Sequence, residues 1–140
     1  METVQSKFKQ NIKDRIAPGL RKLGFKGSGQ NYQLPSTSHW KCLSFQKSSF
    51  SDAGNLTFTI NLLVIDRNQW EIARKKHSHF PKKPTATTFW GIGWQKRLGH
   101  LMPENRDYWW EISLTTDLDQ LSANVLKIIE QYALPNLKKN

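Results

Sequence analysis

Apolar residues recur every three or four positions along the first part of the chain, which is the spacing of an amphipathic helix. The positions that share this spacing are Val4, Phe8, Ile12, Ile16, Leu20 and Leu23. Gly24 suits the left-handed position just after a helix, with Phe25 packing back on Leu20. Pro18 removes a backbone hydrogen bond and disfavours helical geometry at the residue before it, so we expect a kink or a break near Ala17.

The same spacing returns near the end of the chain. Its apolar positions are Leu118, Leu121, Val125, Ile128, Ile129 and Tyr132. Asp117, three residues before Gln120, resembles a capping box at the start of this second helix. We expect Pro135 to limit the helix.

Between the two helices, apolar and polar residues alternate in the manner of β-strands. The clearest alternation runs through Leu56, Phe58, Ile60, Leu62 and Val64, and we expect further strands over residues 30–34, 40–47, 89–98 and 108–115. A helix, a series of strands and a last helix favour an α+β fold. We therefore predict one domain over residues 1–140, with a single antiparallel sheet of about five strands flanked by an N-terminal and a C-terminal helix.

One connection in this plan is long. It opens with a segment from Asn68 to Ala73 that suits a short helix, and its remainder is charged and rich in proline. We expect residues 74–88 to form a mobile basic loop that is too charged to bury. The cations of this loop are Arg74, Lys75, Lys76, Lys82 and Lys83.

The composition describes a basic, tryptophan-rich protein with a net charge of +10 and 6 Trp in 140 residues. The excess of Lys and Arg lies in residues 1–100, which makes attraction to polyanions physically reasonable. The single cysteine, Cys42, forms no internal disulfide, and we find neither a signal-peptide core nor an apolar run long enough to cross a bilayer. We therefore expect a cytoplasmic protein with no membrane partner.

Several short segments together resemble a known family. They are Leu23-Gly24-Phe25, Phe45-Gln46-Lys47-Ser48, Phe58-Thr59-Ile60-Asn61-Leu62, Arg97-Leu98-Gly99-His100-Leu101-Met102-Pro103, Asp107-Tyr108-Trp109-Trp110 and Ala133-Leu134-Pro135. In this order they resemble the bacterial domain-of-unknown-function 4304 family over nearly the whole chain. The resemblance implies a single bacterial cytoplasmic domain with no established activity, so it supplies no catalytic residues.

The sequence lacks the residue patterns of most catalytic sites. Cys42 and the four histidines, His39, His77, His79 and His100, do not have the spacing of a zinc site. Gly91-Ile92-Gly93 lacks the third glycine of a dinucleotide fingerprint, and there is no phosphate loop and no serine elbow. The carboxylates of Glu104, Asp107 and Glu111 lie near arginines and are more simply interpreted as ion pairs. We predict no catalytic residue, no metal and no cofactor, and we favour binding over catalysis.

One candidate small-ligand site follows from the strand alternation. If residues 89–98 alternate regularly, Trp90, Ile92 and Trp94 face the core together with Trp110, Ile112 and Leu114. Gly91 and Gly93 then form a flat floor on the other face beside Arg97 and Trp109, with Glu111 orienting Arg97. Alternatively, Arg97 and Glu111 form a structural cross-strand pair, and a helix or loop covers Trp109.

Three classes of function stay open. We expect a non-enzymatic binding protein for an anionic partner, either nucleic acid or another polyanion, because of the charge, the basic loop and the tryptophans. One alternative is a protein-binding module of immunity or antitoxin type. The other is a small-ligand or enzymatic domain that uses the pocket around Arg97 and Trp109. The sequence does not determine the oligomeric state.

Overall fold

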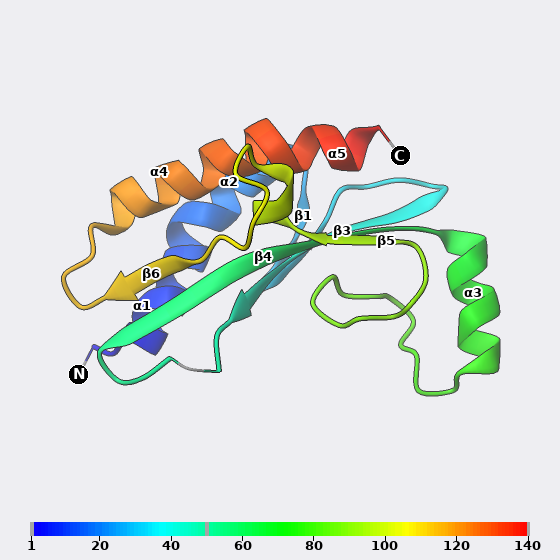
Figure 1. Cartoon of the computed structure of the whole chain (residues 1–140), viewed down its shortest axis with the longest axis horizontal. Coiled ribbons are helices and arrows are strands. Elements are labelled where there is room, and N and C mark those ends of the chain that lie inside the picture. The colour runs from blue at the N-terminus through cyan, green and yellow to red at the C-terminus, as the bar shows by residue number, and fades with distance from the viewer. Residues whose placement is uncertain (1, 50, 140) are drawn as a thin grey trace.

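Two helical runs pack on the same face of an antiparallel sheet (Figure 1). The computed structural model describes residues 2–49 and 51–139. The first run consists of α1 (Val4–Asn11), η1 (Ile12–Ile16) and α2 (Ala17–Lys22), and the second of α4 (Leu118–Ile128), η3 (Ile129–Ala133) and α5 (Leu134–Lys138). The predicted α+β fold, an antiparallel sheet flanked by an N-terminal and a C-terminal helix, is confirmed.

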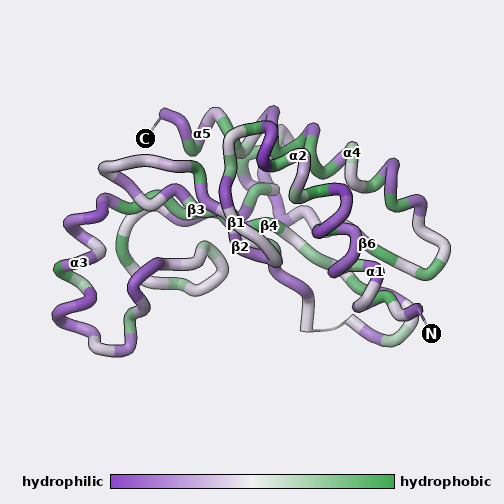
Figure 2. The backbone as a smooth tube through the Cα atoms, turned by 180° about the vertical axis from the view of Figure 1, so that it is seen from behind, coloured by the Kyte–Doolittle hydropathy of each residue, from purple (hydrophilic) through white to green (hydrophobic). Residues whose placement is uncertain are grey.

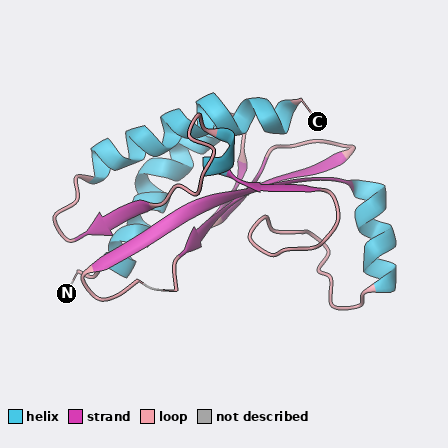
Figure 3. Ribbon diagram, viewed as in Figure 1, coloured by secondary structure: helices cyan, strands magenta, loops and turns pink. Residues whose placement is uncertain are grey.

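The strands pair in the order β1-β2-β3-β4-β5, and β6 also pairs with β4. Their bounds are β1 (Lys26–Ser28), β2 (Asn31–Gln33), β3 (His39–Lys47), β4 (Asn55–Asp66), β5 (Trp94–Arg97) and β6 (Trp110–Ser113). Because β5 pairs with residues 61–64 of β4 and β6 with residues 55–58, the two short strands share one edge of β4 (Figure 3). This arrangement brings the segments around residues 97 and 109 together beside the middle of β4.

The main core lies between the sheet and the two helical runs. The alternating apolar residues of β4, from Leu56 to Val64, all belong to it, as the sequence predicts. Trp110 and Ile112 of β6 join them, and the Trp110 ring stacks on Phe58 with centroids 5.5 Å apart. The hydropathy colours of Figure 2 follow this division, with hydrophilic residues frequent on α3 (Arg67–Lys76), outside the main core.

The helix ends follow the local signals of the sequence. Gly24 takes a left-handed conformation with φ of 103°, and the N–H of Phe25 donates to the carbonyl of Leu20 at 3.0 Å. This is the predicted Schellman ending. At the start of α4, the Asp117 carboxylate accepts the N–H of Gln120 at 3.1 Å, as expected of an N-cap.

Both prolines lie inside helical runs, so a break near Ala17 and an end of the helix at Pro135 are wrong expectations. Ala17 keeps helical dihedrals, with φ of −57° and ψ of −44°, and the chain stays helical to Lys22. Pro135 lies in α5, which continues to Lys138. In each run a π-helical turn, η1 or η3, ends shortly before the proline. The wider turn moves the carbonyl group that would otherwise clash with the proline ring, so the helix continues.

The predicted strand over residues 89–98 is confined to β5, and β1 was not predicted. Gly91 and Gly93 have positive φ values of 76° and 75°, so the alternation stops before β5 begins. Trp90 consequently packs on the face of the sheet opposite to Trp94, which corrects its expected place in the main core. Leu114, also predicted as core, is 54% exposed because β6 ends at Ser113.

The other face of the sheet is covered at one end by α3 and the segment that follows it (Figure 1). A second core cluster forms there from Trp40, Cys42, Leu63, Ile65, Trp70 and Ala86. Residues 74–76 of the predicted basic loop belong to α3, while Pro84 and Ala86 are buried. The expectation that this segment is too charged to bury is therefore wrong at Pro84 and Ala86, and its mobility stays a prediction.

Candidate functional site

Beyond the part covered by α3, the same face of the sheet is polar. The side chains that β3, β4 and β5 place there in register are Ser44, Gln46, Thr59, Asn61 and Arg97. We call this region the polar face. It contains the Arg97 and Trp109 pair that the sequence analysis singles out.

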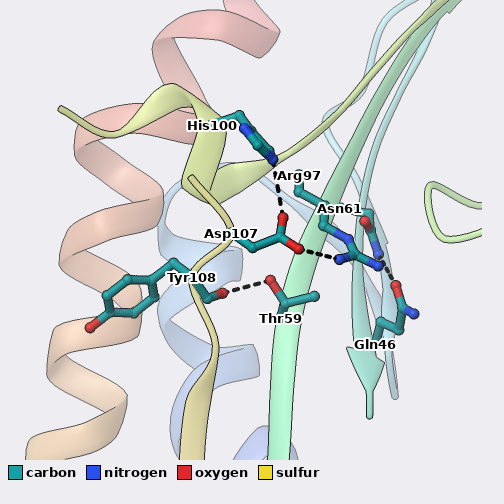
Figure 4. A network of polar contacts seen from close by, with 7 residues as sticks. All are labelled: Gln46, Thr59, Asn61, Arg97, His100, Asp107 and Tyr108. Atoms are coloured by element: carbon teal, nitrogen blue, oxygen red, sulfur yellow. Dashed lines mark hydrogen bonds and ion pairs between the residues drawn. The ribbon is translucent and has the colours of Figure 1, made fainter. Parts of the chain in front are cut away.

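Arg97 is held by a carboxylate from the chain segment before β6. Its guanidinium donates to Asp107 Oδ2 at 2.7 Å, and Asp107 Oδ1 lies 3.1 Å from His100 Nε2 (Figure 4). Nearby, the Thr59 hydroxyl donates to the Tyr108 carbonyl at 2.8 Å. One carboxylate thus joins β5, the turn after it and the segment before β6.

The structure brings together only part of the predicted small-ligand site. The Arg97 guanidinium lies 5.1 Å from the centre of the Trp109 ring, so these two side chains are neighbours as expected. The carboxylate on Arg97 is Asp107, whereas Glu111 lies in β6 opposite Thr57.

The two glycines lie elsewhere. Gly93 comes just before Trp94, which pairs with Val64, while Arg97 pairs with Asn61 at the other end of β5. An added Cβ on Gly93 would lie 2.8 Å from Ile65 Cβ, so this glycine permits close packing on β4. Gly91 and Gly93 therefore do not form a floor beneath Arg97 and Trp109.

The charges of the polar face are matched within the protein. Asp107 pairs with Arg97, the residue that the sequence offers as an anion anchor. The side chains of Arg97, Asp107 and His100 are each partly exposed. The sequence analysis interprets Glu104, Asp107 and Glu111 as ion-pair partners of nearby arginines, and the Arg97–Asp107 pair agrees with this. It names Glu111 as the residue that orients Arg97, because the local sequence does not distinguish the three carboxylates. The arrangement is better suited to joining three chain segments than to holding a free anion.

Gly99 allows the turn after β5 to pack closely on the segment before β6. It lies in the 3-10 turn η2 (Leu98–Leu101), which packs directly on the backbone before β6. An added Cβ would lie 2.3 Å from the carbonyl oxygen of Arg106 and 2.6 Å from the backbone nitrogen of Tyr108. Neither atom belongs to a flexible side chain, so the backbone itself would have to move.

We expect Gly99→Ala to destabilise the protein by about 1–3 kcal/mol, as overpacking at a close backbone contact does. Urea unfolding followed by circular dichroism measures this loss. Gly54→Ala is the matched control, because its added Cβ would have only the Asp52 carboxylate nearby, at 3.7 Å. Equal stability of the two variants would contradict the close packing of η2 on residues 106–108.

The predicted basic loop forms a second candidate site at the α3 end of the molecule. Four of its cations, Lys75, Lys76, Lys82 and Lys83, are exposed, and we call them the basic ridge. Arg74 differs, because its guanidinium donates to both carboxylate oxygens of Glu71 at 3.0 Å. Its charge is therefore compensated within α3.

The path of the loop is defined by contacts with buried groups. The Trp70 indole N–H lies 3.2 Å from the Pro81 carbonyl and 3.1 Å from the Lys82 carbonyl. The Trp70 ring packs on Phe80 and Trp90, with centroid distances of 5.1 Å and 5.0 Å. These contacts hold the segment around Lys82 against α3, the helix that carries Lys75 and Lys76.

A groove of about 410 Å³ lies beside the basic ridge. Phe80 and Trp90 contribute aromatic surface to it, and Lys76 and His77 contribute polar atoms. We call it the α3 groove. Its aromatic residues escaped the sequence analysis because Trp90 was assigned to the main core.

Cys42 is not a nucleophile at neutral pH. Burial raises the pKa of its thiol to about 12, and nearby Arg67 lowers that pKa only in part. Over residues 2–49 and 51–139, no group of three or more His, Cys, Asp or Glu side chains is arranged to hold a metal ion. None of the helices in this described part of the chain is long and apolar enough to span a bilayer.

No curated protein and no solved structure matches the chain. The model of one family, described as a domain of unknown function (DUF4304), matches residues 16–139. The match begins in η1 and covers α2, the whole sheet, α3 and the C-terminal helical run. Since it includes nearly all of the fold described above, the chain belongs to the DUF4304 family.

Proposed function

We propose that the protein binds single-stranded nucleic acid, with a base in the α3 groove and phosphates on the basic ridge. The observation that carries this proposal is the position of Phe80 and Trp90 in a groove that Lys76 and His77 also line. Aromatic faces beside cations are the common elements of sites for single strands, because bases stack on the rings while phosphates pair with the charges.

The electrostatics support the same partner. The protein carries a net charge of +10, and the four lysines of the basic ridge are exposed at one end of the molecule. Each phosphate that a lysine neutralises releases counterions from the nucleic acid, which favours binding at low salt. Phe89, 83% exposed on the same loop, offers a further ring for stacking.

Preorganisation also favours this site. The hydrogen bonds from Trp70 hold the backbone at Pro81 and Lys82, so less loop ordering opposes binding. The cytoplasmic location that the sequence favours belongs to the same proposal, since single-stranded RNA is available there.

Fluorescence anisotropy with a labelled oligothymidylate of about 16 nucleotides tests this proposal. We expect affinity to fall steeply with salt. Changing Lys75, Lys76, Lys82 and Lys83 to Gln should flatten the slope of log K against log salt by up to about 2.8, since each phosphate contact contributes about 0.7 for single strands. Trp90→Leu should weaken binding by about 1–3 kcal/mol through the lost stacking.

The control carries the same change of charge on other elements. Lys22, Lys127 and Lys138 are exposed on the two helical runs, and Lys139 directly follows α5. Replacement of these four lysines by Gln should leave most of the affinity intact. Equal losses in the two quadruple variants would show that only net charge matters. No binding at low salt, or an unchanged slope without the ridge lysines, would overturn the proposal.

A further inference from the structure

A separate cavity of about 620 Å³ opens between the N-terminal helical run and the hairpin of β1 and β2. We call it the hairpin cavity. It lies on the helix side of the sheet, whereas the α3 groove lies against the other face. Its size is within the range of small-molecule sites, about 300–1,000 Å³.

The inner wall of the hairpin cavity is apolar. Phe8, Ile12 and Ala17 contribute from the helical run, and all three are buried in the main core. The Tyr32 ring contributes from β2 and packs edge-on against Phe45, with centroids 6.1 Å apart. These four side chains form the apolar floor of the cavity, and each is at most 3% exposed.

The hydroxyl of Tyr32 has an unmet hydrogen-bonding capacity. Tyr32 is only 3% exposed, and its hydroxyl has no hydrogen-bond partner among the described residues. A buried polar atom without a partner destabilises the folded protein, because it has lost its hydrogen bond to water. Burial raises the pKa of this hydroxyl above its usual value, and Arg21 lowers it only in part. The hydroxyl therefore stays protonated and keeps a hydrogen to donate.

Positive charge surrounds the same cavity. Lys9, Lys13 and Arg21 line it, against a single carboxylate from Asp14. Arg21 also donates to the Gly27 carbonyl at 3.1 Å, so it links the helix to the hairpin beside the cavity. Across the opening, Gly29 at the hairpin tip has open space where a Cβ would be.

We propose that the hairpin cavity binds a small amphipathic anion, a molecule with an apolar body and one carboxylate, sulfonate or phosphate group. The body packs on Phe8, Ile12 and the Tyr32 ring, while the charged group lies between Lys9, Lys13 and Arg21. One oxygen of the ligand accepts the hydrogen bond of the Tyr32 hydroxyl. This site is independent of the proposed nucleic-acid site.

Titration of the full chain with 8-anilinonaphthalene-1-sulfonate, followed by its fluorescence, tests the proposal. We expect saturable binding of one probe per chain and displacement by dodecanoate. Dodecanol lacks the charge and acetate lacks the apolar body, so neither should displace the probe at comparable concentration. Displacement by dodecanol as effective as that by dodecanoate would overturn the anionic part of the proposal.

Tyr32→Phe separates a ligand contact from a structural role. Because it removes an unpartnered hydroxyl, the unliganded variant should melt at the same temperature as the wild type or higher. Its affinity for the probe should nevertheless fall about tenfold, the loss of one hydrogen bond to a charged group. Unchanged affinity, whatever the melting temperature, would show that the hydroxyl does not contact the ligand.

The charged residues that line the hairpin cavity are tested with variants that leave its apolar residues unchanged. Lys9→Gln and Lys13→Gln should each weaken probe binding by up to about fivefold at low salt. The control pair Lys22→Gln and Lys127→Gln changes the net charge equally and should leave binding unchanged. Replacing Lys75 and Lys76 by Gln should also leave it unchanged, since these lysines belong to the basic ridge. Loss of probe binding in that variant would assign the probe to the α3 groove and overturn the proposal.

Discussion

Replacing Trp70 with alanine is expected to lower the free energy of unfolding by about 3–5 kcal/mol, as removal of a large core aromatic does. Trp70 is fully buried at the centre of the second core cluster, between Phe80 and Trp90. Its indole also holds the Pro81 and Lys82 carbonyls. Urea unfolding measures the loss of stability. Limited trypsinolysis should show faster cleavage after Lys75, Lys76 and Lys82, because the variant frees the loop.

Trp70→Phe is the matched variant. It keeps an aromatic ring in the cluster and removes only the N–H donor, so its expected cost is about 1–2 kcal/mol. Trp70→Ala should abolish oligonucleotide binding together with the loop geometry, while Trp70→Phe should retain part of it. A loss below about 1 kcal/mol for Trp70→Ala would mean that the loop does not depend on this side chain.

Trp110→Ala is expected to destabilise the protein by a similar amount, about 3–5 kcal/mol. Trp110 lies on the helix side of β6, stacks on Phe58 and donates its indole N–H to Asn124 at 3.0 Å. The substitution removes this stacking and leaves the Asn124 side chain without its donor. Urea unfolding and the calorimetric melting temperature measure the effect.

The neighbouring tryptophan provides the control. Trp109 is partly exposed on the polar face and contacts the Arg97 guanidinium. Trp109→Ala should therefore cost on the order of 1 kcal/mol, the value of an exposed cation–π contact. If Trp109→Ala were the more destabilising change, the register of β6 on β4 would be reversed.

Local patterns predicted the regular elements well, because each is determined by residues close together in the sequence. The alternation from Leu56 to Val64 predicted the central strand and the face it buries. Gly24 and Asp117 predicted the end of one helix and the start of another. Such signals work because caps and amphipathic faces depend on neighbours within a few residues.

The predictions failed where the effect of a residue depends on the backbone conformation around it. Pro18 was expected to kink or break its helix and Pro135 to limit the last one, but both helical runs continue past the proline, each after a π-helical turn. Gly91 and Gly93 were placed in a regular strand, but their positive φ values send Trp90 to the other face. A hydrophobic pattern cannot show either effect, because it contains no information on backbone conformation.

The sequence alone determined the α+β class, the central strand, the two terminal helices and the excess of positive charge. Only the tertiary structure decided which carboxylate meets Arg97, which aromatic rings line the α3 groove, and that the Tyr32 hydroxyl is buried without a partner among the described residues. Strands and helices follow from short-range periodicity, which one chain segment contains in full. Contacts between β2 and α1, or between residues 97 and 107, depend on how distant segments pack, and many pairings of the same residues satisfy the same local pattern.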